Sequence, residues 1–174
     1  MKQRIALVTL VLSCIFSLWL YFASDIKIER ELTSKEWQST MTTLLSETIV
    51  NDPENPLNQL ARVTVRSNVK YLPNYSYIRV SYIELFDKEQ TLVGTLGISE
   101  TGSWELSDQY LLVNPAEFKD SSAPRPKTLS QEQVDIIKGL FVSDAQQSRR
   151  VDVINSRAIL LTSLDHGSRV LSSN

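Results

Sequence analysis

The fold of this chain is indicated most clearly by the segment RVTVRSNVKYLPNYSYIRVSYIELF, residues 62–86. In its first half, apolar or small side chains alternate with polar ones, which is the two-residue period of a half-buried strand. The face so defined consists of Val63, Val65, Ser67, Val69 and Tyr71. The second half, Tyr75–Phe86, is rich in Tyr, Ile and Val and predicts another strand. Pro73 and Asn74 lie between them, so the two strands should form a hairpin.

Further strands are predicted on both sides of this hairpin. Three short strands should follow it, at Thr91–Ser99, Trp104–Leu106 and Tyr110–Val113, and Asn114-Pro115 should end the third. Arg150–Ile154 and Arg157–Ser163 predict a closing hairpin about Asn155-Ser156, followed by a polar tail. The segment 36–50 has features of both helix and strand, and we interpret it as a strand.

One helix is predicted after a loop at residues 121–127. Ser130 and Gln133 have the spacing of a capping box, so the helix should begin at Gln131 and run to about Gln147. Leu129 and Val134 stand where a hydrophobic staple would. An apolar stripe then predicts that the helix packs on the sheet. The stripe comprises Val134, Ile137, Leu140 and Phe141.

Together these elements predict a mostly β fold, a small antiparallel lipocalin-like barrel with one packed helix over residues 25–174. Closure of a sheet removes its exposed edges. Gly102 and Trp104 resemble the Gly-x-Trp signature at the floor of lipocalin-like barrels. A small barrel can hold one apolar ligand. Alternation nominates a ligand-binding pocket, although the same residues would form the core of a filled barrel. They are Ile78, Val80, Tyr82, Leu111 and Val113.

The N-terminal segment predicts a membrane anchor. Lys2 and Arg4 precede an uncharged stretch, Ile5–Ser24. A helix over these residues would be about 30 Å long, which matches the hydrocarbon core of a bilayer. The positive-inside bias places residues 1–4 in the cytoplasm and residues 25–174 on the other side. A cleavable signal peptide is disfavoured, because Tyr21 and Phe22 occupy positions where small residues belong.

Composition excludes several classes of function. The formal net charge is −2, so nucleic acid is not an expected partner. Cys14 is the single cysteine and lies in the predicted anchor, so no disulfide is expected. His166 is the single histidine, and no zinc site or other cofactor is predicted.

The hypothesis that the protein is a serine hydrolase rests on one short segment, residues 163–168. Ser163, Asp165, His166 and Ser168 supply the residue types of a catalytic triad. Neighbours this close in sequence rarely converge in the required geometry, and no Gly-x-Ser-x-Gly elbow is present. We therefore expect a non-enzymatic protein. A hydrolase using Ser163 or Ser168 stays as an alternative, and it predicts an activity that His166→Ala abolishes.

Several segments together resemble the ToxS family of transmembrane regulatory proteins. They are SDIKIERELTSKEWQS, RVTVRSNVKYLPN, YLLVNPAEFKD and QQSRRVDVINSRAILLTSLDHGSRVL, in addition to the N-terminal anchor. The most specific parts are SNVKYLPN at residues 67–74 and LLTSLDHGS at residues 160–168. The similarity extends through nearly the whole chain, apart from a loop around residues 51–58.

The resemblance implies a single-pass protein of the bacterial inner membrane with a periplasmic domain. It implies a heterodimer with the periplasmic domain of ToxR, a membrane-bound transcription activator. It further implies that the protein shields ToxR from proteolysis, promotes expression of virulence and porin genes, and helps to sense bile salts. A stand-alone periplasmic carrier of lipids is the alternative, and it should bind its ligand without a partner.

Overall fold

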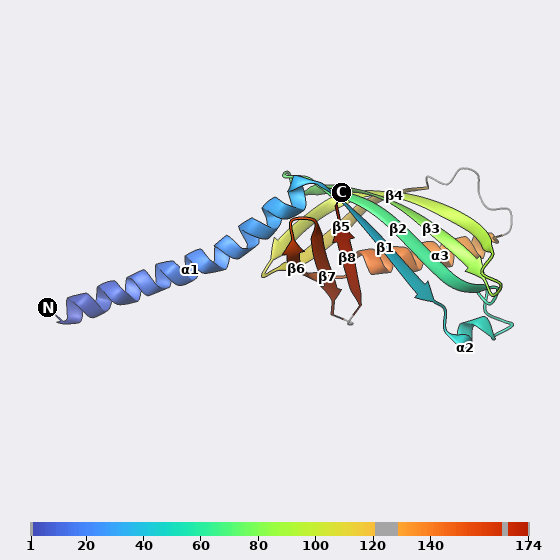
Figure 1. Cartoon of the computed structure of the whole chain (residues 1–174), viewed down its shortest axis with the longest axis horizontal. Coiled ribbons are helices and arrows are strands. Elements are labelled where there is room, and N and C mark those ends of the chain that lie inside the picture. Colours follow the sequence, from blue (N-terminus) through green and yellow to red (C-terminus); the bar gives the residue numbers. More distant parts are fainter. Residues whose placement is uncertain (1, 121–128, 165–166, 174) are drawn as a thin grey trace.

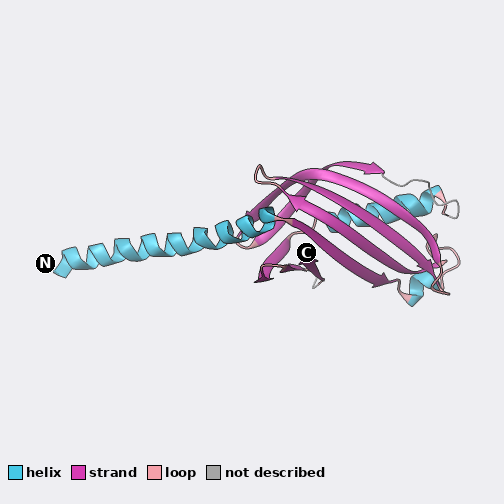
Figure 2. Cartoon of the chain, turned by 45° about the horizontal axis from the view of Figure 1, so that its top comes forward, coloured by secondary structure: helices cyan, strands magenta, loops and turns pink. Residues whose placement is uncertain are grey.

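The computed structural model describes residues 2–120, 129–164 and 167–173 of the chain. Eight antiparallel strands form a closed barrel in sequence order, β1 to β8, and one long helix extends away from it (Figures 1 and 2). The predicted fold class, a mostly β antiparallel barrel with one packed helix, is confirmed. The elements are α1 Lys2–Ser34, β1 Glu36–Leu44, α2 Glu47–Val50, β2 Leu60–Tyr71, β3 Ser76–Asp87, β4 Leu92–Ser107, β5 Tyr110–Asp120, α3 Gln131–Ala145, β6 Arg149–Asn155, β7 Ala158–Ser163 and β8 Ser168–Ser172.

The β2–β3 hairpin is confirmed, and its register runs from Tyr71 opposite Tyr77 to Leu60 opposite Asp87. Strand β2 places its predicted face inside the barrel, where Ser67, Val69 and Tyr71 are buried. The polar residues between them lie on the outer face, because successive side chains of a strand point to opposite sides. The prediction of a strand at residues 36–50 is confirmed for β1, Glu36–Leu44, but it was wrong for Glu47–Val50, which forms the short helix α2.

The predicted breaks in the β4–β5 region were wrong. Strand β4 is one continuous element of 16 residues, not two short strands. Strand β5 continues past Asn114-Pro115 to Asp120, because the register shifts by one residue there: Gly102 lies opposite Pro115, and Thr101 lies opposite Glu117. A bulge of this kind accommodates a proline that lacks an N–H for the ladder.

Gly102 permits the close approach of β4 to this bulge. A Cβ atom at position 102 would lie 2.2 Å from the Asn114 carbonyl oxygen and 2.9 Å from the Pro115 Cα. Both atoms belong to the backbone, so no side-chain rotation can relieve the overlap. At Gly139, in the middle of α3, no atom beyond its chain neighbours and the surrounding helix backbone lies within 4 Å of the corresponding position.

These two glycines give a matched prediction. Gly102→Ala should lower the free energy of unfolding by about 3 kcal/mol, because overpacking against backbone forces the strands apart. Gly139→Ala should instead raise it by about 0.5–1 kcal/mol, because alanine favours the helix. Urea unfolding followed by tryptophan fluorescence measures both. A neutral Gly102→Ala would contradict the tight β4–β5 contact.

Helix α3 begins where predicted and is held by the predicted cap. The Ser130 Oγ accepts a hydrogen bond from the Gln133 backbone N–H at 3.2 Å, and the Gln133 side chain accepts one from the Ser130 N–H at 2.8 Å. Val134, Ile137 and Phe141 are buried against the sheet. Leu140 is 61% exposed, so its assignment to the buried stripe was wrong.

The C-terminal segment departs from the prediction of a polar tail. Strands β6 and β7 form the predicted hairpin, but Ser168–Ser172 adds an eighth strand that pairs with β7. Strand β8 also meets β1, with Gln38 opposite Ser172, and this contact completes the barrel. The short segment has few apolar residues, so its pairing is set by its neighbours in the fold.

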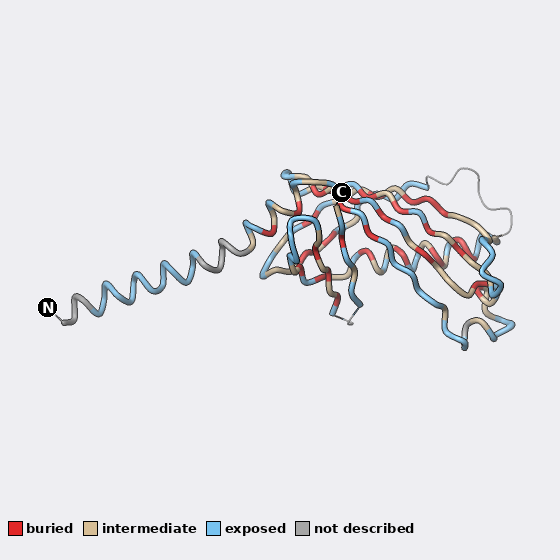
Figure 3. The backbone as a smooth tube through the Cα atoms, viewed as in Figure 1, coloured by how far each residue is buried: buried red, intermediate tan, exposed pale blue. Residues whose placement is uncertain are grey.

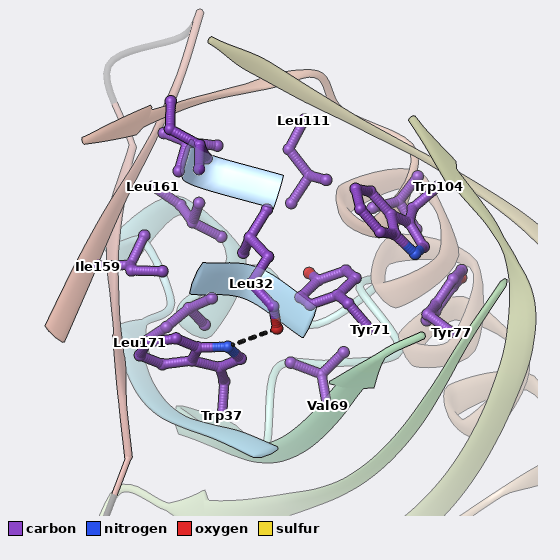
Figure 4. Close-up of a cluster of buried hydrophobic side chains, with 13 residues drawn as sticks. Leu32, Trp37, Val69, Tyr71, Tyr77, Trp104, Leu111, Ile159, Leu161 and Leu171 are labelled. Carbon is purple, nitrogen blue, oxygen red and sulfur yellow. Dashed lines mark hydrogen bonds between the residues drawn. The ribbon is translucent and has the colours of Figure 1, made fainter. Parts of the chain in front are cut away.

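The last turns of α1 form part of the barrel. Leu32 is fully buried, and its carbonyl oxygen accepts a hydrogen bond from the Trp37 indole at 3.0 Å (Figure 4). The Asp25 carboxylate accepts the backbone N–H groups of Asp108 and Gln109, each at 3.1 Å. The end of the barrel nearest α1 is therefore closed by this helix.

The predicted membrane span, residues 5–24, lies on α1. Among the residues that the structure describes, no helix combines enough length with enough apolar character to cross a membrane.

Buried residues alternate with more exposed ones along the strands (Figure 3). The buried hydrophobic residues form two clusters. The first lies at the α1 end around Trp37, Tyr71, Tyr77 and Trp104 (Figure 4). The second lies beneath α3. It contains Leu57, Leu60, Ile83, Leu85, Leu96, Ile98, Val134, Ile137 and Phe141. Buried charged residues lie near both clusters, and the candidate site is built around them.

Candidate ligand-binding cavity

An apolar cavity of about 190 Å³ lies between the barrel wall and α3. Alternate residues of β1, β2 and β3 line one side, and the C-terminal half of α3 lines the other. The lining residues are Met41, Thr43, Leu45, Leu57, Leu60, Val63, Val65, Ile83, Ile137, Leu140, Phe141, Asp144 and Arg169. Only the last two are charged. The cavity thus has an apolar body with charged groups on its wall. Such a cavity suits a molecule that has an apolar part and a charged part.

The charged part of the cavity is organised around Asp144, in the last turn of α3. Its Oδ1 accepts a hydrogen bond from Arg149 at 2.9 Å, and its Oδ2 accepts one from Arg169, also at 2.9 Å. Arg149 donates in addition to the Asp144 carbonyl oxygen at 2.6 Å. One carboxylate therefore links α3 to β6 and β8. Burial lowers the pKa of the Arg149 guanidinium, whereas Asp144 acts in the opposite direction.

A second ion pair lies deeper in the barrel. Arg79 on β3 donates to Glu100 Oε2 from Nε at 3.1 Å and from Nη2 at 2.5 Å. The Tyr77 hydroxyl donates to the other oxygen of the same carboxylate. Burial, followed by this hydrogen bond, raises the pKa of the Tyr77 hydroxyl. The Arg79 guanidinium lies 5.2 Å from the centre of the Phe141 ring, so the pair also contacts α3.

A smaller polar cavity of about 20 Å³ separates these two charged groups. Arg79, Arg149 and Arg169 all line it, together with Tyr71 and the hydroxyls of two serines, Ser39 and Ser67. Burial raises the pKa of the Tyr71 hydroxyl, although the three arginines oppose this shift. Arg169 lines both cavities, so the apolar and the polar space meet at its side chain.

The sequence-predicted pocket residues lie in two different places. Leu111 and Val113 on β5 are buried and line the smaller cavity. On β3 the predicted face was wrong: Ile78 is 48% exposed, Tyr82 is 50% exposed, and Val80 lies between them on the outer face. The interior face of β3 carries Tyr77, Arg79, Ser81, Ile83 and Leu85.

Sequence reasoning missed the charged residues of the site. Arg79, Arg149 and Arg169 were not singled out, and neither were Asp144 and Glu100. A signal existed on β3, because Arg79 is a charged residue on a face that it shares with the large apolar or aromatic side chains of Tyr77, Ile83 and Leu85. A charged residue on an interior face needs a buried partner. The position of that partner depends on how β4 pairs with β3, which the sequence does not specify.

The residues of the hydrolase alternative are only partly described. Ser163 is buried at the end of β7, and its hydroxyl donates to the Gly167 carbonyl oxygen at 3.0 Å. Ser168 is exposed at the start of β8. Asp165 and His166 lie outside the described residues. The described part of the segment therefore forms a turn between two strands.

The wall of the apolar cavity has a seam between β1 and β8. These strands pair at Gln38 and Ser172, and β1 then continues to Leu44 with β2 as its partner. Met41 and Thr43, on this part of β1, line the cavity. Met41 is 38% exposed, Leu44 is 73% exposed, and Leu140 on α3 is 61% exposed. Met41 and Leu140 therefore present exposed apolar side chains at the cavity, and the pairing of β1 with β8 among the described residues does not extend beyond Gln38.

The fold and the cavity define a small, closed antiparallel β-barrel with an internal apolar space and buried charges. Residues 21–172 match the family model described as "Trans-membrane regulatory protein ToxS". Two relatives have the same description. The chain is 52% identical to a transmembrane regulatory protein ToxS of Vibrio parahaemolyticus over 174 residues, which cover 100% of both chains. It is 51% identical to that of Vibrio cholerae over 173 residues, which cover 99% of this chain and 98% of the relative. The chain belongs to the ToxS family of transmembrane regulatory proteins.

Proposed function

We propose that this protein is a non-enzymatic accessory and co-sensor protein, anchored in the bacterial inner membrane by residues 5–24. The N-terminus is cytoplasmic and the barrel is periplasmic in this proposal. The family description as a transmembrane regulatory protein supports it. The exposed apolar side chains of α1 support it as well, among them Leu7, Leu10, Phe16 and Trp19. Lipid tails would cover these side chains, and Lys2 and Arg4 would remain at the cytoplasmic surface.

The partner in this proposal is the periplasmic domain of ToxR, which binds along the free edge of β1. A strand edge offers unpaired backbone groups to an incoming chain, and strand addition is a common mode of recognition. The exposed side chains of Met41, Leu44 and Leu140 would be buried by the same partner. Anchoring both proteins in one membrane raises their effective concentration, so modest contacts are sufficient. A covered edge would also be protected from proteases.

The ligand in this proposal is a bile salt in the cavity beneath the seam. The observation that carries the proposal is the position of this cavity, which has an apolar lining and lies next to the edge that the partner covers. If ToxR completes the wall, its binding and that of the bile salt must strengthen each other by the same factor. The complex would then convert the presence of bile into regulation of virulence and porin genes.

Binding of the ToxR periplasmic domain to the full chain in nanodiscs tests the proposal, with and without submicellar deoxycholate. Deoxycholate should tighten the association. Leu44→Asp should weaken it, because a charge blocks an edge. Ile154→Asp is the matched control, since Ile154 is 59% exposed on β6, away from the β1 edge.

The other outcomes separate the alternatives. Deoxycholate binding without any association with ToxR would indicate a stand-alone carrier. Association that deoxycholate does not change would remove the co-sensor role and leave the accessory role. If neither ligand nor partner binds, the proposal is wrong.

A further inference from the structure

The buried charges near the two cavities do not balance. Three arginines, Arg79, Arg149 and Arg169, face two carboxylates, those of Glu100 and Asp144. Arg79 has Glu100 as its own partner, so Arg149 and Arg169 share Asp144. Buried cations ordinarily have a full set of partners, because removing a charge from water is costly. Among the described residues, this group therefore has one more positive charge than negative charges.

Arg169 is the arginine with the weakest set of partners. Its side chain is 11% exposed. Its Nη2 donates to Asp144 and also to the Met41 sulfur at 3.2 Å, and sulfur is a weak acceptor. Its buried Nε atom has no hydrogen-bond partner among the described residues. Of the arginines that the structure describes, Arg169 is also the one that lines the apolar cavity.

We propose that Arg169 binds the acidic group of an anionic amphiphile whose apolar part fills the cavity. The inference rests on the proposed function, because it takes the cavity as the ligand site and a bile salt as one such ligand, and it adds the residue that binds the acidic group and the carboxylate that competes with it. The acid replaces Asp144 as the partner of Arg169, and Asp144 remains paired with Arg149. Three cations then face three anions, and each is paired.

This exchange has a structural consequence. The Asp144–Arg169 pair joins the last turn of α3 to β8, beside the seam with β1. A ligand that takes Arg169 from Asp144 releases this link. Asp144 thus competes with the ligand, and the pair acts as a latch on the wall of the cavity.

Equilibrium dialysis of the full chain in nanodiscs tests the inference, with empty nanodiscs as the reference for partition into lipid. The probes are deoxycholate and its uncharged methyl ester, which has the same apolar body. Arg169→Gln should weaken deoxycholate binding about tenfold, the usual scale for loss of a charged hydrogen-bond partner, and leave the ester unchanged. Asp144→Asn should tighten deoxycholate binding several-fold, because it removes the competing charge. Arg150→Gln is the control, since its exposed guanidinium pairs with Asp152 outside the cavity.

The effect of Asp144→Asn keeps the test independent of folding, because a damaged barrel does not bind a ligand more tightly. The inference is overturned if Arg169→Gln weakens both probes equally, or if Asp144→Asn leaves deoxycholate binding unchanged. In those cases the cavity remains the ligand site and the proposed function stands. A wild-type chain that binds neither probe overturns the ligand part of the proposed function, and the inference with it.

Discussion

Glu100→Ala should lower the free energy of unfolding by about 3–5 kcal/mol, the usual cost of removing one partner from a buried ion pair. Glu100 is 1% exposed, and its carboxylate accepts hydrogen bonds from both Arg79 and Tyr77. Alanine would leave the Arg79 guanidinium buried without a counterion and the Tyr77 hydroxyl without an acceptor. Urea unfolding of the full chain in nanodiscs, followed by near-UV circular dichroism, measures the loss.

Two further variants show whether the cost comes from the unpaired charge. Glu117→Ala removes an exposed carboxylate that pairs with Lys119 at 3.3 Å, and it should change stability by about 0.5 kcal/mol or less. The double replacement Arg79→Met with Glu100→Leu should recover much of the loss, because apolar residues of similar volume can replace a buried pair. A loss below about 1 kcal/mol for Glu100→Ala would show that the pair is not buried as described.

Trp37→Ala should also cost about 3–5 kcal/mol, the range measured for large-to-small changes in protein cores. The side chain of Trp37 on β1 is fully buried among residues of β2 and β8 and the end of α1 (Figure 4). Alanine would leave a cavity and would also remove the hydrogen bond to the Leu32 carbonyl oxygen. The loss should appear in urea unfolding and as faster proteolysis between α1 and β1.

The chain supplies a matched control for this change. Trp19 is 63% exposed on α1, so Trp19→Ala should leave the stability of the barrel within about 0.5 kcal/mol of the wild type. Trp37→Phe keeps most of the apolar volume and loses the hydrogen bond, which should cost about 1 kcal/mol plus a small packing term. Equal effects of alanine at positions 19 and 37 would contradict the burial of Trp37.

The fold was predictable where one face of a strand differed clearly from the other. On β2, the polar residues Arg66, Asn68 and Lys70 mark the outer face, so the inner face follows from alternation. On β3 both faces carry apolar residues, and the inner face also carries Arg79 and Ser81. Apolar content alone therefore favoured the wrong side, with Ile78, Val80 and Tyr82.

The ends of strands were harder to predict because local signals competed with tertiary pairing. Gly94 and Gly97 in β4 and Asn114-Pro115 in β5 are typical of strand breaks. The neighbouring strands nevertheless hold both elements in one sheet, and a bulge takes up the irregularity. Strand β8 has few apolar residues, and its pairing with β7 and β1 depends on closure of the barrel.

The sequence predicted an apolar ligand pocket in the barrel, but it did not indicate the residues that line the larger cavity. Alternation correctly placed Leu111 and Val113 inside the barrel, but they line the small polar cavity. The larger cavity depends on where α3 lies against β1 and β2, a long-range arrangement that no local pattern encodes. Asp144 meets Arg149 and Arg169 only because the end of α3 lies close to the starts of both β6 and β8.

The continuity of α1 fixes how the barrel faces its surroundings. The helix runs without interruption from residue 2 to Ser34, and its last turns are held by Asp25, Leu32 and Trp37. If residues 5–24 cross the bilayer, the contacts of Asp25 with the backbone of Asp108 and Gln109 place the turn between β4 and β5 next to the membrane surface. Each residue of a helix also turns the chain by about 100°. The number of helix residues that precede the contacts with the barrel therefore sets the direction, within the membrane plane, in which the β1 edge points. A partner in the same membrane must approach from that side.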